Sequence, residues 1–131
     1  MSSRTEYVLD SSALIALVSL EPGYQRVAEL IGRSSISAVN LAETINKLIP
    51  KVPTMDAVRL LLADLDLVVE DWSESMAYRS AEFSPFNKSH GLSFGDRACL
   101  TLAKHLTATA VTSDRTWRRL PSLGVSVMLF R

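Results

Sequence analysis

The stretch VLDSSALIAL, Val8 to Leu17, places a carboxylate between two apolar segments. The residues before Asp10 have the apolar content of a buried strand, and those after Ser12 have that of a helix. An Asp at such a junction loses its hydration unless a hydrogen-bond donor or a cation compensates it. The stretch therefore predicts a strand that ends at an acid and continues as a helix, and this unit organises the rest of the fold.

Composition limits the classes of protein that this chain can belong to. The 131 residues suit one domain, which we expect to span 1–131, and a hydrophobic fraction of 47% suffices for a core. The formal net charge is zero, from 14 basic and 14 acidic residues, which argues against a general nucleic-acid coat protein but permits a local basic patch. One cysteine, Cys99, excludes an internal disulfide. With no signal peptide and no apolar run of membrane-spanning length, we expect a soluble cytoplasmic protein without a membrane partner.

Short apolar runs alternate with helical patterns along the chain. Strands are predicted over 6–10, 34–37, 67–70, 108–114 and 125–130. Helices are predicted over 12–21, 22–32, 38–49, 54–65, 93–106 and 114–120, and another begins at a capping box, Asp71 to Glu74, and ends near Pro85. This alternation predicts an α/β fold, with a parallel sheet of about five strands covered by helices on both faces. Ligands of such sheets bind beyond the carboxyl ends of the strands.

Two acids close apolar strands in this pattern. Asp10 follows the first predicted strand, and Asp114 follows the fourth. A helix cap explains either one alone. Because a parallel sheet brings the carboxyl ends of its strands to one edge, the pair together indicates a shared site.

Two further acids lie on predicted helices. Glu43 shares a helix face with Asn40 and Lys47, and periodicity alone favours a solvated face with a Glu43–Lys47 ion pair. Asp96 lies three residues after Ser93, so a capping box is the simplest explanation for it. However, Asp96 also begins an apolar stripe that continues at Cys99. A carboxylate turned toward a core needs a partner, and a cation is a natural one.

Other chemistries fit the sequence poorly. His90 and His105 are isolated and have no companions at zinc-ligand spacing. The glycines are scattered and form no phosphate-binding loop. Cys99, inside an apolar stripe, is predicted to be a small core residue.

Taken together, four segments resemble PIN-domain ribonucleases, in particular the VapC-type toxins of bacterial toxin–antitoxin pairs. YVLDSSALIALVSLEPG (7–23) is similar to the opening strand and helix of the family, with Asp10 as its first acid. ISAVNLAET (36–44) resembles the segment of the second acid, Glu43, and GLSFGDRACLTLA (91–103) that of the third, Asp96. AVTSDRTW (110–117) resembles the fourth segment, with Asp114 as its acid. The resemblance extends from about Tyr7 to Phe130 in the expected order.

This resemblance implies a PIN-like three-layer α/β/α sandwich in which Asp10, Glu43, Asp96 and Asp114 converge as catalytic residues and metal ligands. Carboxylate ligands favour Mg²⁺ or Mn²⁺. Ser12 and Thr112 are expected to orient these ligands or bound waters. The resemblance further implies an RNA substrate, a cognate antitoxin protein and a homodimer. Local charge offers candidate phosphate contacts at Lys47, Arg97, Arg115, Arg118 and Arg119.

We therefore expect a metal-dependent endoribonuclease that hydrolyses RNA phosphodiester bonds as a toxin. Two alternatives stay open: a non-catalytic α/β module that binds a partner, and a structure-specific DNA nuclease with the same metal chemistry. Trp117 is expected to pack against the sheet edge, although it could also stack on a base.

Overall fold

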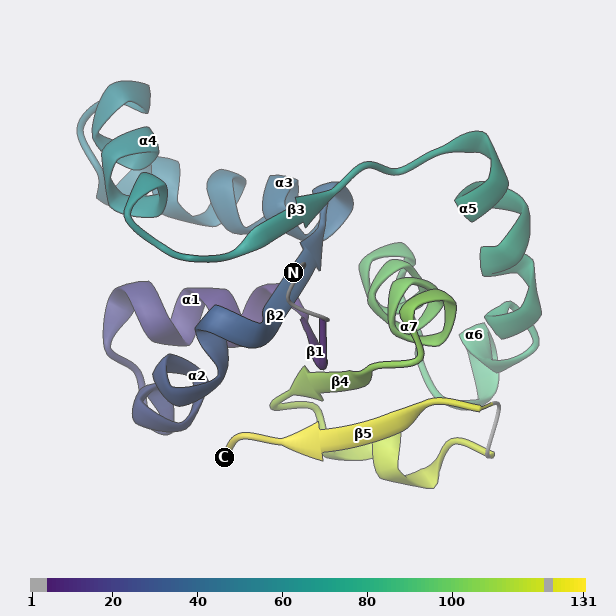
Figure 1. Cartoon of the computed structure of the whole chain (residues 1–131). Coiled ribbons are helices and arrows are strands. Elements are labelled where there is room, and N and C mark those ends of the chain that lie inside the picture. Colours follow the sequence, from purple (N-terminus) through teal and green to yellow (C-terminus); the bar gives the residue numbers. More distant parts are fainter. Residues whose placement is uncertain (1–4, 122–123) are drawn as a thin grey trace.

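A computed structural model of the chain describes residues 5–121 and 124–131. Its sheet contains β1 (Tyr7–Leu9), β2 (Ser34–Ser37), β3 (Val68–Glu70), β4 (Thr109–Thr112) and β5 (Ser126–Leu129). The strands are all parallel and follow the order β3-β2-β1-β4-β5 (Figure 1). The predicted five-stranded parallel sheet is confirmed. The strand order reverses between β1 and β4, so the crevice beyond the ends of these two strands is where ligands of such sheets bind.

Helices cover both faces of this sheet. They are α1 (Ser11–Ser19), α2 (Tyr24–Leu30), α3 (Ala38–Leu48), α4 (Met55–Ala63), α5 (Glu74–Ser80), α6 (Phe86–Ser89) and α7 (Phe94–Leu106). Single turns of 3₁₀ helix occur at Ile31–Arg33, Ile49–Lys51 and Ala81–Phe83, and a longer one at Arg115–Arg119. Figure 1 shows α1 and α2 on one side of the sheet and α5, α6 and α7 on the other, which confirms the three-layer sandwich. In the same view α4 lies at the periphery, beyond α3.

The central strand β1 is buried on both faces because its side chains alternate between two cores. Val8 packs with α7 residues such as Cys99. Leu9 packs with Ala13 and Val27 on the opposite face. Both strand residues are fully buried, and burying a side chain of this size stabilises the fold by about 1.5–3 kcal/mol. This packing holds the end of β1, and hence Asp10, in one place.

The sequence placed the start of the fifth helix wrongly. The capping residue is Ser73, whose hydroxyl accepts from the main-chain N–H of Met76, and Asp71 lies before the helix. The helix does end near Pro85, as expected: α5 extends to Ser80, a 3₁₀ turn covers Ala81–Phe83, and the separate helix α6 begins after Pro85. Ser84 keeps helical backbone angles, but Pro85 supplies no N–H for the Ala81 carbonyl, which accepts from the N–H of Ser84 in a 3₁₀ turn, and the α-helical hydrogen bonding stops there.

Trp117 belongs to the core. Its side chain is 1% exposed and packs with the cluster that contains Phe83 and Leu100. The predicted packing role is therefore confirmed, and the alternative of base stacking is wrong. Among residues 5–121 and 124–131, no helix combines the length and the apolar character needed to cross a membrane.

Candidate active site

Asp10 connects the end of β1 to the start of α1. It is the N-cap of α1, where its Oδ1 accepts from the main-chain N–H of Ala13 at 3.0 Å. Oδ1 also accepts from the Ser12 hydroxyl at 2.6 Å, and Oδ2 accepts from the Thr112 hydroxyl at 2.5 Å. The carboxylate is 6% exposed. The cap role is therefore real, but two hydroxyls hold this carboxylate in addition to the single bond that a cap provides.

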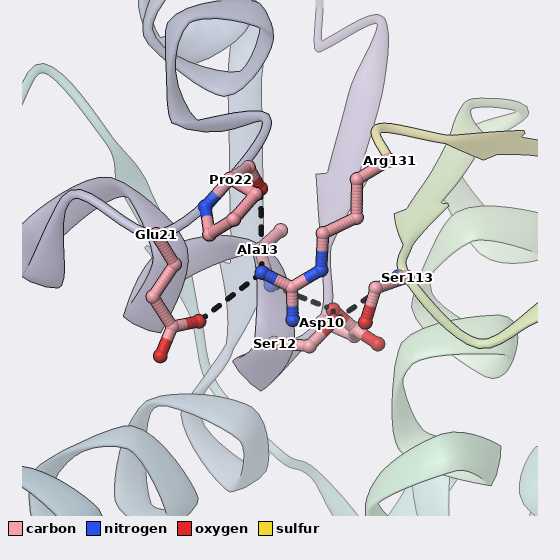
Figure 2. Close-up of polar contacts among 7 residues, drawn as sticks. All are labelled: Asp10, Ser12, Ala13, Glu21, Pro22, Ser113 and Arg131. Atoms are coloured by element: carbon pink, nitrogen blue, oxygen red, sulfur yellow. Dashed lines mark hydrogen bonds and ion pairs between the residues drawn. The ribbon is translucent and has the colours of Figure 1, made fainter.

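Ser12 and Thr112 also connect the ends of β1 and β4. The Ser12 hydroxyl accepts from the N–H of Ser113 at 3.2 Å, and Figure 2 draws Ser12, Asp10 and Ser113 close together. The Thr112 hydroxyl accepts from the N–H of Asp114 at 3.0 Å. The loop that carries Asp114 is thus attached to the Asp10 carboxylate through these two hydroxyls.

Asp96 lies in the first turn of α7. The predicted capping box is confirmed: Asp96 Oδ2 accepts from the N–H of Ser93 at 2.9 Å, and the Ser93 hydroxyl accepts from the N–H of Asp96 at 3.1 Å. The residue is half-buried. The cap fixes one carboxylate oxygen, while the charge remains beside the apolar face of α7.

Glu43 reaches from α3 toward the start of α7. Its Oε1 accepts from Asn40 Nδ2 at 2.9 Å, and the same Nδ2 donates to the carbonyl of Gly95 at 3.0 Å. Asn40 is 1% exposed, so this helix face is not solvated as periodicity suggested. The expected Glu43–Lys47 ion pair does not occur among the ion pairs of the described residues. Sequence reasoning noted the spacing of Asn40 and Glu43 but missed the contact with Gly95, which is distant in sequence.

Asp114 is the N-cap of the 3₁₀ turn Arg115–Arg119. Its Oδ1 accepts from the N–H of Thr116 at 3.0 Å and from the hydroxyl of the same residue at 2.7 Å. Unlike the other three acids, Asp114 is exposed. It therefore lies at the rim of the site.

The four acids affect one another electrostatically. Burial raises the pKa of Asp10, hydrogen bonds from Ser12, Thr112 and Ala13 lower it in part, and the charge of Asp96 raises it. Burial also raises the pKa of Asp96, and the charges of Asp114 and Glu43 add to the increase. Asp96 is thus the acid that interacts electrostatically with each of the other three. Neighbouring carboxyl groups, two of which have raised pKa values, are a physical signature of a functional site.

Each acid retains acceptor capacity after its protein hydrogen bonds are made. Within the described chain, Glu43 Oε2, Asp96 Oδ1 and Asp114 Oδ2 accept no hydrogen bond, and Asp10 Oδ2 accepts only one. A carboxylate has about four lone-pair sites, so each acid can accept further partners. In residues 5–121 and 124–131, no three Asp, Glu, His or Cys side chains already form a cage for an ion. Mg²⁺ binds through one or two carboxylates and retains several waters, so this all-oxygen donor set fits such an ion.

The candidate phosphate-binding residues differ in availability. Lys47, Arg115, Arg118 and Arg119 are exposed. Arg97 is half-buried and occupied: its Nη1 donates to Asn87 Oδ1 at 2.9 Å, and its guanidinium lies 5.9 Å from the ring centroid of Phe94. Figure 2 also shows Arg131, which donates to Glu21 Oε1 and to the Pro22 carbonyl, each at 3.3 Å. The exposed cations cluster mainly after β4, next to Asp114.

The chain belongs to the PIN-domain family, because the family model matches residues 7–123. This match includes all four acids. A comparison with curated protein sequences finds no significant match.

Solved structures with the same fold come from several bacteria. VapBC from Salmonella typhimurium, solved bound to DNA, is 18% identical, with a TM-score of 0.76 over 96% of this chain and 98% of that chain. VapBC2 from Rickettsia felis, bound to a promoter DNA fragment, is 20% identical, with a TM-score of 0.70 over 94% and 97%. VapC20 from Mycobacterium tuberculosis, described as a toxin that cleaves the sarcin–ricin loop, is 16% identical, with a TM-score of 0.70 over 92% and 99%. At these identities the likeness shows a shared fold.

Proposed function

We propose that this protein is a metal-dependent endoribonuclease and the toxin of a toxin–antitoxin pair. PIN domains are nucleases, and the chain belongs to that family. One observation carries the proposal: hydrogen bonds attach the acids to one another in pairs. The Thr112 hydroxyl binds both the Asp10 carboxylate and the N–H of Asp114. Asn40 binds both Glu43 and the carbonyl of Gly95, the residue before Asp96. The substrate class is supported by VapC20, a protein of the same fold whose described target is RNA. The proposed site of action is the cytoplasm, where that substrate is found.

A divalent cation explains why carboxylates gather in a partly buried region. Like charges at short range destabilise one another, and burial adds to the penalty. When bound, Mg²⁺ or Mn²⁺ supplies a water of lowered pKa and neutralises charge on the phosphate. Asp10 and Asp96 would hold the ion, Glu43 would hold the ion or orient the attacking water, and Asp114 would complete the site at its rim. Ser12 and Thr112 keep the Asp10 carboxylate in a single orientation.

Basic residues near the acids would hold the RNA backbone. Arg115, Arg118 and Arg119 follow Asp114 directly and are exposed, and Lys47 is exposed one turn after Glu43. Their charge offsets the repulsion between phosphates and an acidic centre. Arg97 contributes less in this arrangement, because its guanidinium already binds Asn87.

Two observations support an antitoxin partner: solved toxin–antitoxin complexes have the same fold, and this chain has an apolar surface groove. The structures from Salmonella and Rickettsia are VapBC assemblies, and a toxin–antitoxin complex from Klebsiella pneumoniae has the same fold at 18% identity and a TM-score of 0.74. On this chain, a groove of about 250 Å³ is lined by apolar side chains from α1, α3, α4 and the segment that includes β3, together with Arg59 of α4. Val69 on β3, one of the lining residues, is 45% exposed. Such a surface suits an apolar protein segment, and a homodimer through an apolar face is proposed on the same ground.

The test is cleavage by the purified protein after its metal has been removed with EDTA. We expect RNA cleavage that returns with Mg²⁺ or Mn²⁺, and loss of cleavage in folded Asp10→Asn and Asp96→Asn variants. Asp56→Asn is the matched control, because the Asp56 side chain is 91% exposed and remote in sequence from the acids of the site. Cleavage of DNA alone would favour the structure-specific DNA nuclease, and no cleavage of either would favour the non-catalytic module.

Partner binding has its own measurement. The protein would be expressed alone and together with the product of the neighbouring gene, with cell growth and cleaved RNA ends as readouts. We expect growth arrest and new RNA ends only when the protein is expressed alone. Equal growth in both cases would contradict the toxin assignment without affecting the nuclease assignment.

A further inference from the structure

A buried amide joins the second acid to the helix of the third. Asn40 is 1% exposed, and its Nδ2 donates both to Glu43 Oε1, at 2.9 Å, and to the Gly95 carbonyl, at 3.0 Å. The two acceptors beside this nitrogen fix the orientation of the amide, because the amide oxygen in the same place could not donate a hydrogen bond to either of them. Its Oδ1 is buried and has no partner within the described residues. Leaving a buried carbonyl unsatisfied is unfavourable, so the residue is best explained by what its Nδ2 holds.

Gly95 provides the space that the Glu43 carboxylate occupies. It is the second residue of α7 and is buried. A Cβ on Gly95 would lie 2.5 Å from Cδ of Glu43 and would overlap both of its carboxylate oxygens. The three atoms nearest to this hypothetical Cβ all belong to Glu43. Glycine is a poor helix former compared with alanine. Its presence here leaves space for the carboxylate and makes the helix less stable than alanine would.

We propose that Asn40 and Gly95 are positioning residues, which hold the Glu43 carboxylate against the first turn of α7 so that it shares a divalent cation with Asp96. This inference rests on the proposed metal-dependent function. Glu43 and Asp96 come from different helices and carry the same charge, so repulsion favours their separation. Glu43 is half-buried. Without the Asn40 amide and the space left by the missing side chain of Gly95, we expect its carboxylate to turn toward solvent.

Gly95→Ala is the most informative variant, because it is expected to separate stability from metal binding. The three atoms nearest to the added Cβ are at the far end of a flexible side chain, so we expect Glu43 to move and α7 to stay in place. We expect a melting temperature equal to or above that of the wild type, because alanine favours the helix. We also expect Mn²⁺ to bind about 10- to 100-fold more weakly, the range typical of residues that orient metal ligands. Gly32→Ala is the control, since a Cβ there meets its nearest neighbour at 3.6 Å.

Asn40→Ala tests the contribution of the buried amide, with Thr44→Val as its control. Thr44 is also fully buried on α3, and its hydroxyl donates to a main-chain carbonyl, that of Asn40. We expect Asn40→Ala, but not Thr44→Val, to weaken Mn²⁺ binding by about tenfold. Each variant is also made with Glu43→Gln, and in that background we expect no further loss of affinity from either Asn40→Ala or Gly95→Ala.

The readout is the Mn²⁺ dissociation constant of the full chain, measured by electron paramagnetic resonance together with thermal unfolding. Unchanged affinity in folded Gly95→Ala would overturn the inference, as would an equal loss with and without the Glu43 carboxylate. In both cases the wild type still binds Mn²⁺, and the proposed function stands. If the wild type binds no Mn²⁺, the proposed function itself fails, and this inference fails with it.

Discussion

Thr112 is predicted to be the most important single hydroxyl of the site for stability, and Thr112→Val tests this. Its hydroxyl is buried, donates to Asp10 Oδ2 at 2.5 Å and accepts from the N–H of Asp114 at 3.0 Å. Valine has nearly the same shape, so the substitution removes both hydrogen bonds without opening a cavity. The Asp10 carboxylate is then left in a buried place with one donor fewer.

The expected loss can be estimated from these two bonds. A hydrogen bond to a charged group contributes about 1.5–3 kcal/mol, and a neutral one about 1 kcal/mol. Because Asp114 is exposed and water can replace its lost acceptor, we expect Thr112→Val to lower the free energy of unfolding by about 2–4 kcal/mol. For a domain of this size that corresponds to a fall in melting temperature of roughly 10 °C.

The pH dependence identifies the charged partner. Hydrogen bonding to the carboxylate lowers the pKa of Asp10 against the larger effect of burial, so loss of the bond raises that pKa further. The deficit should therefore be larger at neutral pH than at about pH 4, because it shrinks as the pH falls through the raised pKa of Asp10.

The assay is urea denaturation of the metal-free protein at both pH values, with Thr101→Val as the control. Thr101 is also buried, but its hydroxyl donates at 2.6 Å to the main-chain carbonyl of Arg97, so its deficit should be about 1 kcal/mol or less and independent of pH. The reasoning is refuted if Thr112→Val is no more harmful than the control, or if its deficit is the same at both pH values.

Three further predictions follow from the same contacts. Because the pKa of Asp10 is raised, ionisation of this carboxyl destabilises the metal-free fold increasingly as the pH rises above about 4. Asp10→Asn should therefore unfold at a higher urea concentration than the wild type at neutral pH and lose this advantage in acid. An advantage that persists unchanged in acid would contradict this prediction. Ser93→Ala removes the hydroxyl half of the capping box and should lower the free energy of unfolding by about 1 kcal/mol, measured by thermal denaturation, whereas an unchanged melting temperature would argue against the cap. Arg118→Ala with Arg119→Ala should weaken RNA binding and reduce the slope of log affinity against log salt by about 2, and a slope equal to that of the wild type would exclude both residues from phosphate contact.

The sequence predicted the fold well because its signals are local. Alternating strands and helices indicated the parallel sheet, and the register of β1 with β4 places Leu9 beside Val111, so that Asp10 and the loop of Asp114 lie at one edge. The capping box of Ser93 and Asp96 was also recognisable, since it depends on four consecutive residues. The start of α5 was not, because Asp71 and Ser73 are both good caps and local sequence does not decide between them.

The interior of the site was less predictable, because it depends on contacts between distant segments. Ser12 and Thr112 were identified through the resemblance, yet the way in which they connect β1 and β4 appears only when the strands are placed side by side. Asn40 looked like one residue of a solvated face, since helix periodicity does not reveal that α7 covers it. Its contact with Gly95 spans 55 positions of the chain. An Asn one helical turn before a candidate acid is the sequence signal that could have found it.

The most direct test of the central claim is a crystal structure of the protein soaked in Mn²⁺, with the ion located by anomalous scattering. The account predicts a peak among the carboxylates of Asp10, Asp96 and Glu43, near the start of α7, and no peak there in crystals of Asp10→Asn. The absence of any peak among these acids in the wild type, or a peak that persists unchanged in the variant, would contradict it.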